Sequence, residues 1–145
     1  MKSDPNMIIG YTAGTFDMFH IGHLNLFIGA KKYCDYLIVG VNQDELVEEY
    51  KNKSVIVPFD ERIKIVQSIK YVDETIGVEN LDKKPYWEKL RFNKLFIGSD
   101  WRGNPRWDKT KSEMEAVGVE LIYLPYTQST SSTALREKLM ATIPF

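Results

Sequence analysis

The sequence predicts an α/β fold, a doubly wound parallel sheet of about five strands in a single domain over residues 1–145. Two observations support this expectation. Short and continuously apolar runs, typical of buried parallel strands, alternate along the chain with segments whose apolar residues recur at helical spacing. The length of 145 residues, with 43% hydrophobic and 27% charged residues, also suits one compact domain.

The expected elements follow one another in strand and helix alternation. Strands are predicted over residues 7–12, 36–41, 75–78, 95–97 and 121–124. Helices are predicted over residues 21–32, 44–50, 59–69, 86–91, 108–117 and 134–140. Pro58 precedes the third of these helices and Gly118 follows the fifth, as is common at helix starts and ends. This succession indicates a Rossmann-like fold, in which ligands bind beyond the carboxyl ends of the strands.

Composition excludes several classes of function. The net charge of -1 and the scattered Lys and Arg residues provide no basic surface for nucleic acid. Cys34 is the only cysteine, which excludes an internal disulfide and suits the reducing cytoplasm. No run approaches the roughly 18 apolar residues of a membrane span, and residues 1–6 lack the apolar core of a secretion signal. We therefore expect a cytoplasmic protein without nucleic-acid or membrane partners.

A glycine- and histidine-containing segment, GTFDMFHIGH at residues 14–23, joins the first strand to the first helix. His20 and His23 are three residues apart and share a helix face, at the end where free backbone N–H groups attract anions. Both are predicted catalytic residues that stabilise displacement at a nucleotide α-phosphate. The alternative is that they only cap or decorate the helix. A nucleotide-binding role is expected of the neighbouring residues Gly14, Thr15, Phe16 and Gly22.

The same segment resembles the HxGH signature of the nucleotidyltransferase superfamily, in the GTFDxxHxGH form of the cytidylyltransferases. Adenylyltransferases of the superfamily that act on pantetheine phosphate or nicotinamide mononucleotide usually have a proline where this chain has Met18. The resemblance therefore favours CTP as the nucleotide. It extends over residues 7–139, nearly the whole chain.

A hydroxyl-rich run, YTQSTSST at residues 126–133, follows the last strand. From the residues alone, a plain helix N-cap explains Ser131 or Ser132 as well as a ligand contact does. The run resembles the RTxGISTT motif of the family, whose residues bind the nucleotide phosphates opposite the histidines. The resemblance implies that role for Thr127, Ser131, Ser132 and Thr133.

The run departs from that motif at two positions. Tyr126 replaces an arginine, which removes a cation that would meet the triphosphate, and Ser129 replaces a glycine. Arg136 lies four residues after Ser132, so on a helix it shares that face and is a candidate to supply the missing charge.

The resemblance also implies roles for residues between the two motifs. Lys51 and Lys53 stand where the family has lysines that contact the acceptor phosphate and the nucleotide phosphates, which makes Lys51 a further catalytic candidate. Solvated surface lysines are the alternative that their spacing leaves open. Lys84 matches a substrate-binding lysine, and Asp100 and Trp101 match a segment beside the cytosine and ribose.

Two further stretches carry weaker implications. Arg102, Arg106 and Trp107 follow the Asp100 segment and are candidates for closing over the acceptor. Residues 70–74, KYVDE, resemble the RYVDEV segment of the glycerol-3-phosphate and choline-phosphate cytidylyltransferases, and we expect a structural or interfacial role for Asp73.

Taken with these motifs, the resemblance implies a nucleotidyltransferase that transfers CMP from CTP to a small phosphorylated alcohol, with glycerol 3-phosphate as the best guess. Mg²⁺ is expected to arrive with the nucleotide because no dedicated carboxylate cage for a metal is evident. The family commonly forms homodimers, which we expect here. One alternative is an adenylyltransferase that uses ATP, such as an FAD synthase. Another is a nucleotide-binding protein that has lost catalysis.

Overall fold

A computed structural model describes residues 5–51, 54–98, 105–125 and 130–142. It contains one sheet of five strands in the order β3-β2-β1-β4-β5, and every neighbouring pair is parallel. The strands are β1 (Ile9–Gly14), β2 (Tyr36–Asn42), β3 (Glu74–Val78), β4 (Lys94–Gly98) and β5 (Glu120–Leu124). The predicted Rossmann-like α/β fold is therefore confirmed.

Six helices occupy the described part of the chain. They are α1 (Ile21–Lys31), α2 (Asp44–Lys51), α3 (Phe59–Gln67), α4 (Lys84–Leu90), α5 (Pro105–Ala116) and α6 (Ser132–Thr142). The fourth and fifth begin before their predicted starts at residues 86 and 108, because a proline lies in the first turn of each. Proline suits that turn, since the N–H it lacks would have no partner there. Gly118 has a φ of 84° after α5, which is the left-handed conformation predicted for a helix-ending glycine.

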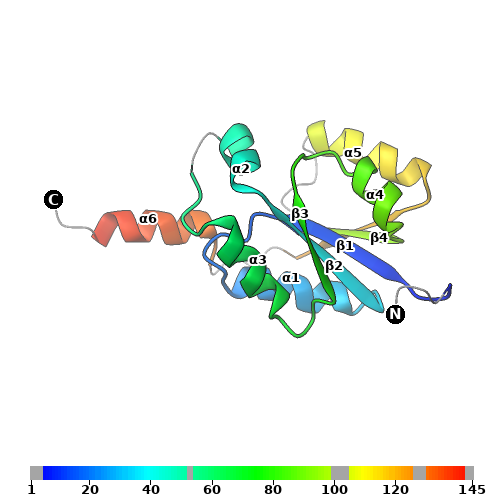
Figure 1. The fold of residues 1–145 in the computed structure, drawn as a ribbon, viewed down its shortest axis with the longest axis horizontal. Coiled ribbons are helices and arrows are strands. Elements are labelled where there is room, and N and C mark those ends of the chain that lie inside the picture. Colours follow the sequence, from blue (N-terminus) through cyan, green and yellow to red (C-terminus); the bar gives the residue numbers. More distant parts are fainter. Residues whose placement is uncertain (1–4, 52–53, 99–104, 126–129, 143–145) are drawn as a thin grey trace.

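The helices cover both faces of the sheet (Figure 1). Phe27 and Ala30 of α1 and Val66 of α3 pack on one face. Leu90 of α4 and Met114 of α5 pack on the other. In Figure 1, α6 projects away from the sheet. The burial of apolar side chains on both faces explains why most strands are apolar without alternation.

Asp73 has the structural role that was expected of it. Its carboxylate accepts a hydrogen bond from the backbone N–H of Leu37 at 2.8 Å and forms an ion pair with Lys31. These contacts tie the start of β3 to β2 and α1. No helix among the described residues combines the length and apolar character needed to cross a membrane.

The order of the strands indicates that a ligand crevice lies at the carboxyl end of β1. The chain runs outward from β1 through β2 to β3, and then returns to the other side of β1 to form β4 and β5. In sheets of this kind, the point where the winding reverses leaves a crevice at the carboxyl ends of the strands. Gly14 ends β1 and Gly98 ends β4, so both residues border this crevice.

Candidate active site

The turn that joins β1 to α1 has unusual backbone geometry. Phe16 and Met18 have φ angles of 54° and 50°, in the left-handed region that side chains larger than glycine rarely adopt. Phe16 is held there by packing, because its ring is buried and lies 5.2 Å from the ring of Phe27 in the core. Strained conformations persist where the surroundings fix them, and they cluster at functional sites. This turn thus fixes the position at which α1 begins.

Both histidines contribute to the start of α1. His20 is the N-cap, and its Nδ1 accepts a hydrogen bond from the backbone N–H of Gly22 at 3.0 Å. His23 occupies the third helical position, and its Nδ1 accepts a hydrogen bond from the backbone N–H of His20 at 3.3 Å. The two rings stack with centroids 3.9 Å apart. Helix capping, the alternative reading of these residues, is therefore present, and it also fixes how the rings point.

The environment favours the neutral form of both rings. Burial lowers the pKa of His20 below its ordinary value. The pKa of His23 is lowered to about 3, first by burial and then by repulsion from His20 and Lys51, against an opposing attraction from Asp17. Because each Nδ1 accepts a hydrogen bond, a neutral ring must carry its proton on Nε2. His20 Nε2 is buried without a hydrogen-bond partner among the described residues.

A cavity of about 350 Å³ lies between the two motifs. His20 and His23 line it from the start of α1. Among the residues that the structure describes, the predicted nucleotide-binding residues of both motifs line the same cavity. They are Gly14, Thr15, Phe16, Gly22, Ser131, Ser132 and Thr133. Lys51 and Arg136 add two cationic side chains. The histidines and the hydroxyl cluster, residues 130–133, are far apart in the chain yet converge on one space.

Both serines of the hydroxyl cluster also hold α6 in place. Ser131 Oγ accepts a hydrogen bond from the backbone N–H of Ala134 at 3.0 Å, which is the N-cap arrangement weighed from the sequence. Ser132 Oγ donates a hydrogen bond to the carbonyl oxygen of Asp17 at 2.6 Å. The start of α6 is therefore fixed against the turn that precedes α1. Two helix N-termini face the cavity, and both favour an anion there.

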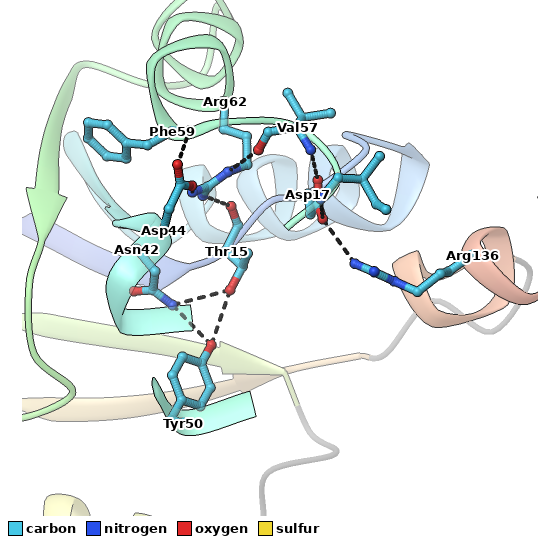
Figure 2. Close-up of polar contacts among 10 residues, drawn as sticks. Thr15, Asp17, Asn42, Asp44, Tyr50, Val57, Phe59, Arg62 and Arg136 are labelled. Atoms are coloured by element: carbon cyan, nitrogen blue, oxygen red, sulfur yellow. Dashed lines mark hydrogen bonds and ion pairs between the residues drawn. The ribbon is translucent and has the colours of Figure 1, made fainter. Parts of the chain in front are cut away.

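Asp17 joins three segments around the cavity (Figure 2). Its buried carboxylate accepts hydrogen bonds from the backbone N–H groups of Ile56 at 2.7 Å and Val57 at 2.8 Å. It also forms an ion pair with Arg136 at 3.2 Å. Arg136 Nη1 donates a second hydrogen bond to the carbonyl oxygen of Ser54 at 3.3 Å. Part of the charge that Arg136 brings to the cavity is thus balanced by Asp17.

Arg62 supports the same turn from the other side. The Arg62 side chain is buried, with 1% of the residue exposed. Its guanidinium donates to the carbonyl oxygens of Thr15 at 2.6 Å and Val57 at 2.7 Å. It also donates to the Asp44 carboxylate at 2.6 Å (Figure 2). Sequence reasoning did not identify Arg62. A signal was present, because Arg62 lies four residues before Val66, on the apolar face of its helix.

A second cavity, of about 440 Å³, adjoins the first. The two share Ala13, Gly14, Thr15, Lys51, Phe96 and Ile97. Lys83 and Arg106 line only the second cavity. Lys84, the residue matched to a substrate-binding lysine, is exposed and lies outside both linings. Lys83 was not singled out from the sequence.

A polar cluster stands on the wall of the second cavity. Thr15 Oγ1 and the Tyr50 hydroxyl are 3.1 Å apart, and Asn42 Nδ2 donates to them at 3.3 Å and 3.2 Å respectively (Figure 2). Asn42 and Tyr50 are further residues that the sequence analysis did not select. Five predicted site residues lie outside the described residues: Lys53, Asp100, Trp101, Arg102 and Thr127. The replaced motif positions Tyr126 and Ser129 lie outside them too.

Comparison with known proteins supports the resemblance seen in the motifs. The chain is 35% identical to the glycerol-3-phosphate cytidylyltransferase of Bacillus subtilis (strain 168), over 88% of this chain and 94% of that protein. It is 34% identical to the FAD synthase of Pyrococcus abyssi (strain GE5 / Orsay), over 78% and 77%. The crystal structure of the lipopolysaccharide core biosynthesis protein from Thermoplasma volcanium GSS1 has the same fold, with a TM-score of 0.70 and 22% identity over 86% of this chain and 99% of that one. Residues 11–138 match the cytidylyltransferase-like family, and the chain belongs to that family.

Proposed function

We propose that the protein transfers CMP from CTP to a small phosphorylated alcohol, giving a CDP-alcohol and pyrophosphate. One observation carries the proposal: the two histidines and the hydroxyl cluster at the start of α6 line a single cavity at the carboxyl end of β1. The nucleotide phosphates would occupy that cavity, between two helix N-termini.

The reaction is an in-line displacement at the α-phosphorus of CTP. A phosphate oxygen of the acceptor attacks this phosphorus, the bond from the α-phosphorus to the oxygen bridging to the β-phosphate breaks, and pyrophosphate leaves with the bonding electron pair. No protein nucleophile or proton transfer is required, because the attacking phosphate is already ionised. Catalysis then depends on positioning and on stabilising charge on the nonbridging oxygens.

His20 and His23 are suited to that stabilisation as neutral hydrogen-bond donors. Their Nδ1 atoms are occupied by backbone N–H groups, so Nε2–H is the donor that each ring can offer. A phosphate oxygen would give the buried His20 Nε2 its hydrogen bond. Donors fixed in advance need no reorganisation as the charge develops.

Lys51 is placed to serve both substrates, because it lines both cavities. Two anionic phosphates must approach each other during the reaction, and an ammonium group at the boundary would offset their repulsion. This supports the catalytic role that the motif resemblance implied for Lys51.

Relatives support CTP and ATP to different degrees. The glycerol-3-phosphate cytidylyltransferase match covers 88% of this chain, and the FAD synthase match covers 78%. Glycerol 3-phosphate is therefore the first acceptor to test, with CTP. Pyrophosphate release should depend on CTP and on the acceptor. Release with ATP and FMN but not with CTP would replace this proposal by the FAD synthase alternative, and nucleotide binding without any release would indicate a protein that has lost catalysis.

Magnesium and a homodimer, which come from the family resemblance, and a cytoplasmic location, which comes from the composition, complete the proposal. Among the described residues, no three His, Cys, Asp or Glu side chains group as metal ligands do. Asp17, the carboxylate on the lining of the nucleotide cavity, is already bound to two backbone N–H groups and Arg136. These residues fit Mg²⁺ carried by the triphosphate, where it would neutralise phosphate charge.

Replacing the histidines tests their role. His20→Ala and His23→Ala should each lower the rate of pyrophosphate release about 10²- to 10³-fold, as loss of one transition-state donor does. CTP binding, measured by calorimetry, should persist in both variants. Turnover at the wild-type rate in either variant would refute the assignment.

A glycine pair on α1 tests ring position without removing a ring. A Cβ at Gly22 would lie 2.8 Å from Cε1 and 3.0 Å from Nδ1 of His20, so Gly22→Ala must displace the imidazole. A Cβ at Gly29 would meet the Leu124 side chain at 3.5 Å, an ordinary contact. Gly29→Ala is therefore the matched control, and it should retain turnover while Gly22→Ala loses most of it. Equal rates in the two variants would show that the His20 position is unimportant.

A further inference from the structure

Lys51 stands at the boundary between the two cavities. It is the last residue of α2, it lines both cavities, and it is exposed. A lysine ammonium is carried on a flexible four-carbon stem, so an exposed lysine does not keep a single position by itself. The role proposed for Lys51 requires one position, between the acceptor phosphate and the nucleotide phosphates. A neighbouring group must therefore hold the ammonium there.

The ring of Tyr50 lies under the Lys51 ammonium. Lys51 Nζ is 5.6 Å from the ring centroid, within the range of about 6 Å in which a cation is attracted to an aromatic face. Tyr50 is half-buried and lines the second cavity. Arg136 is held differently, by the Asp17 carboxylate, which balances part of its charge. The ring of Tyr50 is uncharged, so it restrains the Lys51 ammonium and leaves its charge for a phosphate.

The hydroxyl of Tyr50 fixes the ring in turn. It lies 3.1 Å from Thr15 Oγ1 and accepts a hydrogen bond from Asn42 Nδ2 at 3.2 Å (Figure 2). Asn42 is 5% exposed and ends β2, and Thr15 directly follows β1. Asn42 Nδ2 also donates to Thr15 Oγ1 at 3.3 Å, so the three side chains restrain one another. Because Thr15 belongs to the turn that leads to His20, the ring under Lys51 is tied to the segment that positions the histidines.

We propose that Tyr50 is a positioning residue for the reaction. Its ring holds the Lys51 ammonium at the boundary of the two cavities, and its hydroxyl ties the ring to the ends of β1 and β2. This role rests on the proposed function, in which Lys51 offsets the repulsion between two phosphates. Tyr50 acts through Lys51 and not on the reacting atoms. Loss of the ring should therefore lower activity only while Lys51 is present.

Two replacements of Tyr50 separate the ring from the hydroxyl. Tyr50→Leu removes both groups, and with CTP and glycerol 3-phosphate it should lower kcat/KM for the acceptor about 3- to 30-fold, as loss of a cation–π contact does. Tyr50→Phe keeps a ring under the ammonium and should retain most of that activity. Equal losses in the two variants would show that the ring does not position Lys51.

Tyr33→Leu is the matched control. Lys94 Nζ lies 5.8 Å from the centroid of the Tyr33 ring, which is a similar contact. Neither residue belongs to the lining that the described residues form around the two cavities. Tyr33→Leu should therefore leave kcat/KM at the wild-type value, and a loss equal to that in Tyr50→Leu would contradict the proposal.

A double-mutant cycle with Lys51→Met distinguishes positioning from support of the fold. If Tyr50 acts through Lys51, Tyr50→Leu should change kcat/KM by less than about twofold in the Lys51→Met background. A residue that only supports the fold would lower kcat/KM by the same factor in both backgrounds. That result would overturn the proposal.

The side-chain order of Lys51 tests the contact without turnover. NMR relaxation of the lysine Cε groups in the full chain should show Lys51 more ordered than Lys89, an exposed lysine of α4. Tyr50→Leu should lower the order of Lys51 to that of Lys89. Equal order of the two lysines in the wild-type protein would overturn the proposal even if the enzyme is active. Order that is lost in Tyr50→Leu, with no pyrophosphate released from any acceptor, would retain the contact and refute the proposed reaction.

Discussion

The neutral state of His23 can be measured directly, because His20 and His23 are the two histidines in the chain. Histidine ring signals in a proton NMR titration therefore belong to these two residues, and His23→Asn assigns them. We expect the His23 signal to titrate near pH 3, since burial and repulsion from His20 and Lys51 lower its pKa to about 3. The His20 signal should titrate below the ordinary value of about 6.5 as well.

The same shift predicts how stability depends on pH. The folded pKa of His23 is depressed, so as the pH falls the unfolded chain takes up the proton first. The contribution of neutral His23 to the free energy of unfolding is complete above about pH 6.5 and is lost as the pH falls toward about 3. The slope is about 1.4 kcal/mol per pH unit, which amounts to about 2 kcal/mol at pH 5.

Urea denaturation at pH 8 and pH 5 provides the assay. Carboxylates also titrate over this range, but their effects cancel when wild type is compared with His23→Asn. Wild type should lose about 2 kcal/mol more than the variant between the two pH values. A His23 signal that titrates between pH 6 and 7, or equal losses in the two proteins, would refute the neutral-donor mechanism.

Two further predictions concern other parts of the molecule. Arg62→Met removes the donor to Asp44 Oδ1 and to two carbonyl oxygens and should cost about 3 kcal/mol in urea denaturation. Glu120→Gln, which removes a surface pair at 3.6 Å, should cost less than about 1 kcal/mol. Gly10→Ala places a Cβ 2.4 Å from the Phe96 ring and should cost about 1–3 kcal/mol by the same measurement, unless the core opens to accept it.

The sequence predicted the fold and the location of the site because both depend on local pattern. Buried strands require apolar runs, and parallel strands require helices between them, so the alternation indicated the sheet. Residues that follow such strands gather at one edge, which is why His20 and Ser131 could be expected to meet. Each of these inferences needs only residue type and order.

The remaining features depend on tertiary contacts. Burial of the Phe16 ring holds a left-handed φ that its own side chain disfavours. Arg62 is buried only because two carbonyl groups and a carboxylate from three segments surround it. The position of Lys83 depends on a helix boundary, because one residue turns a helix by about 100°. Sequence patterns place such boundaries to within about two to four residues, so they cannot choose between Lys83 and Lys84.

The spacing of the two histidines follows from helix geometry as well as from chemistry. A residue at the third helical position can return a hydrogen bond to the N-cap backbone, and His23 does so through Nδ1. The hydrogen bond that helps to start α1 therefore also puts the His23 proton on Nε2, where a phosphate can receive it. A serine and glutamate pair would cap the helix as well, but the glutamate carboxylate would present only acceptors to the anion. The histidine pair caps the helix and still offers donors, which explains how the proposed catalytic groups can stand on the capping positions themselves.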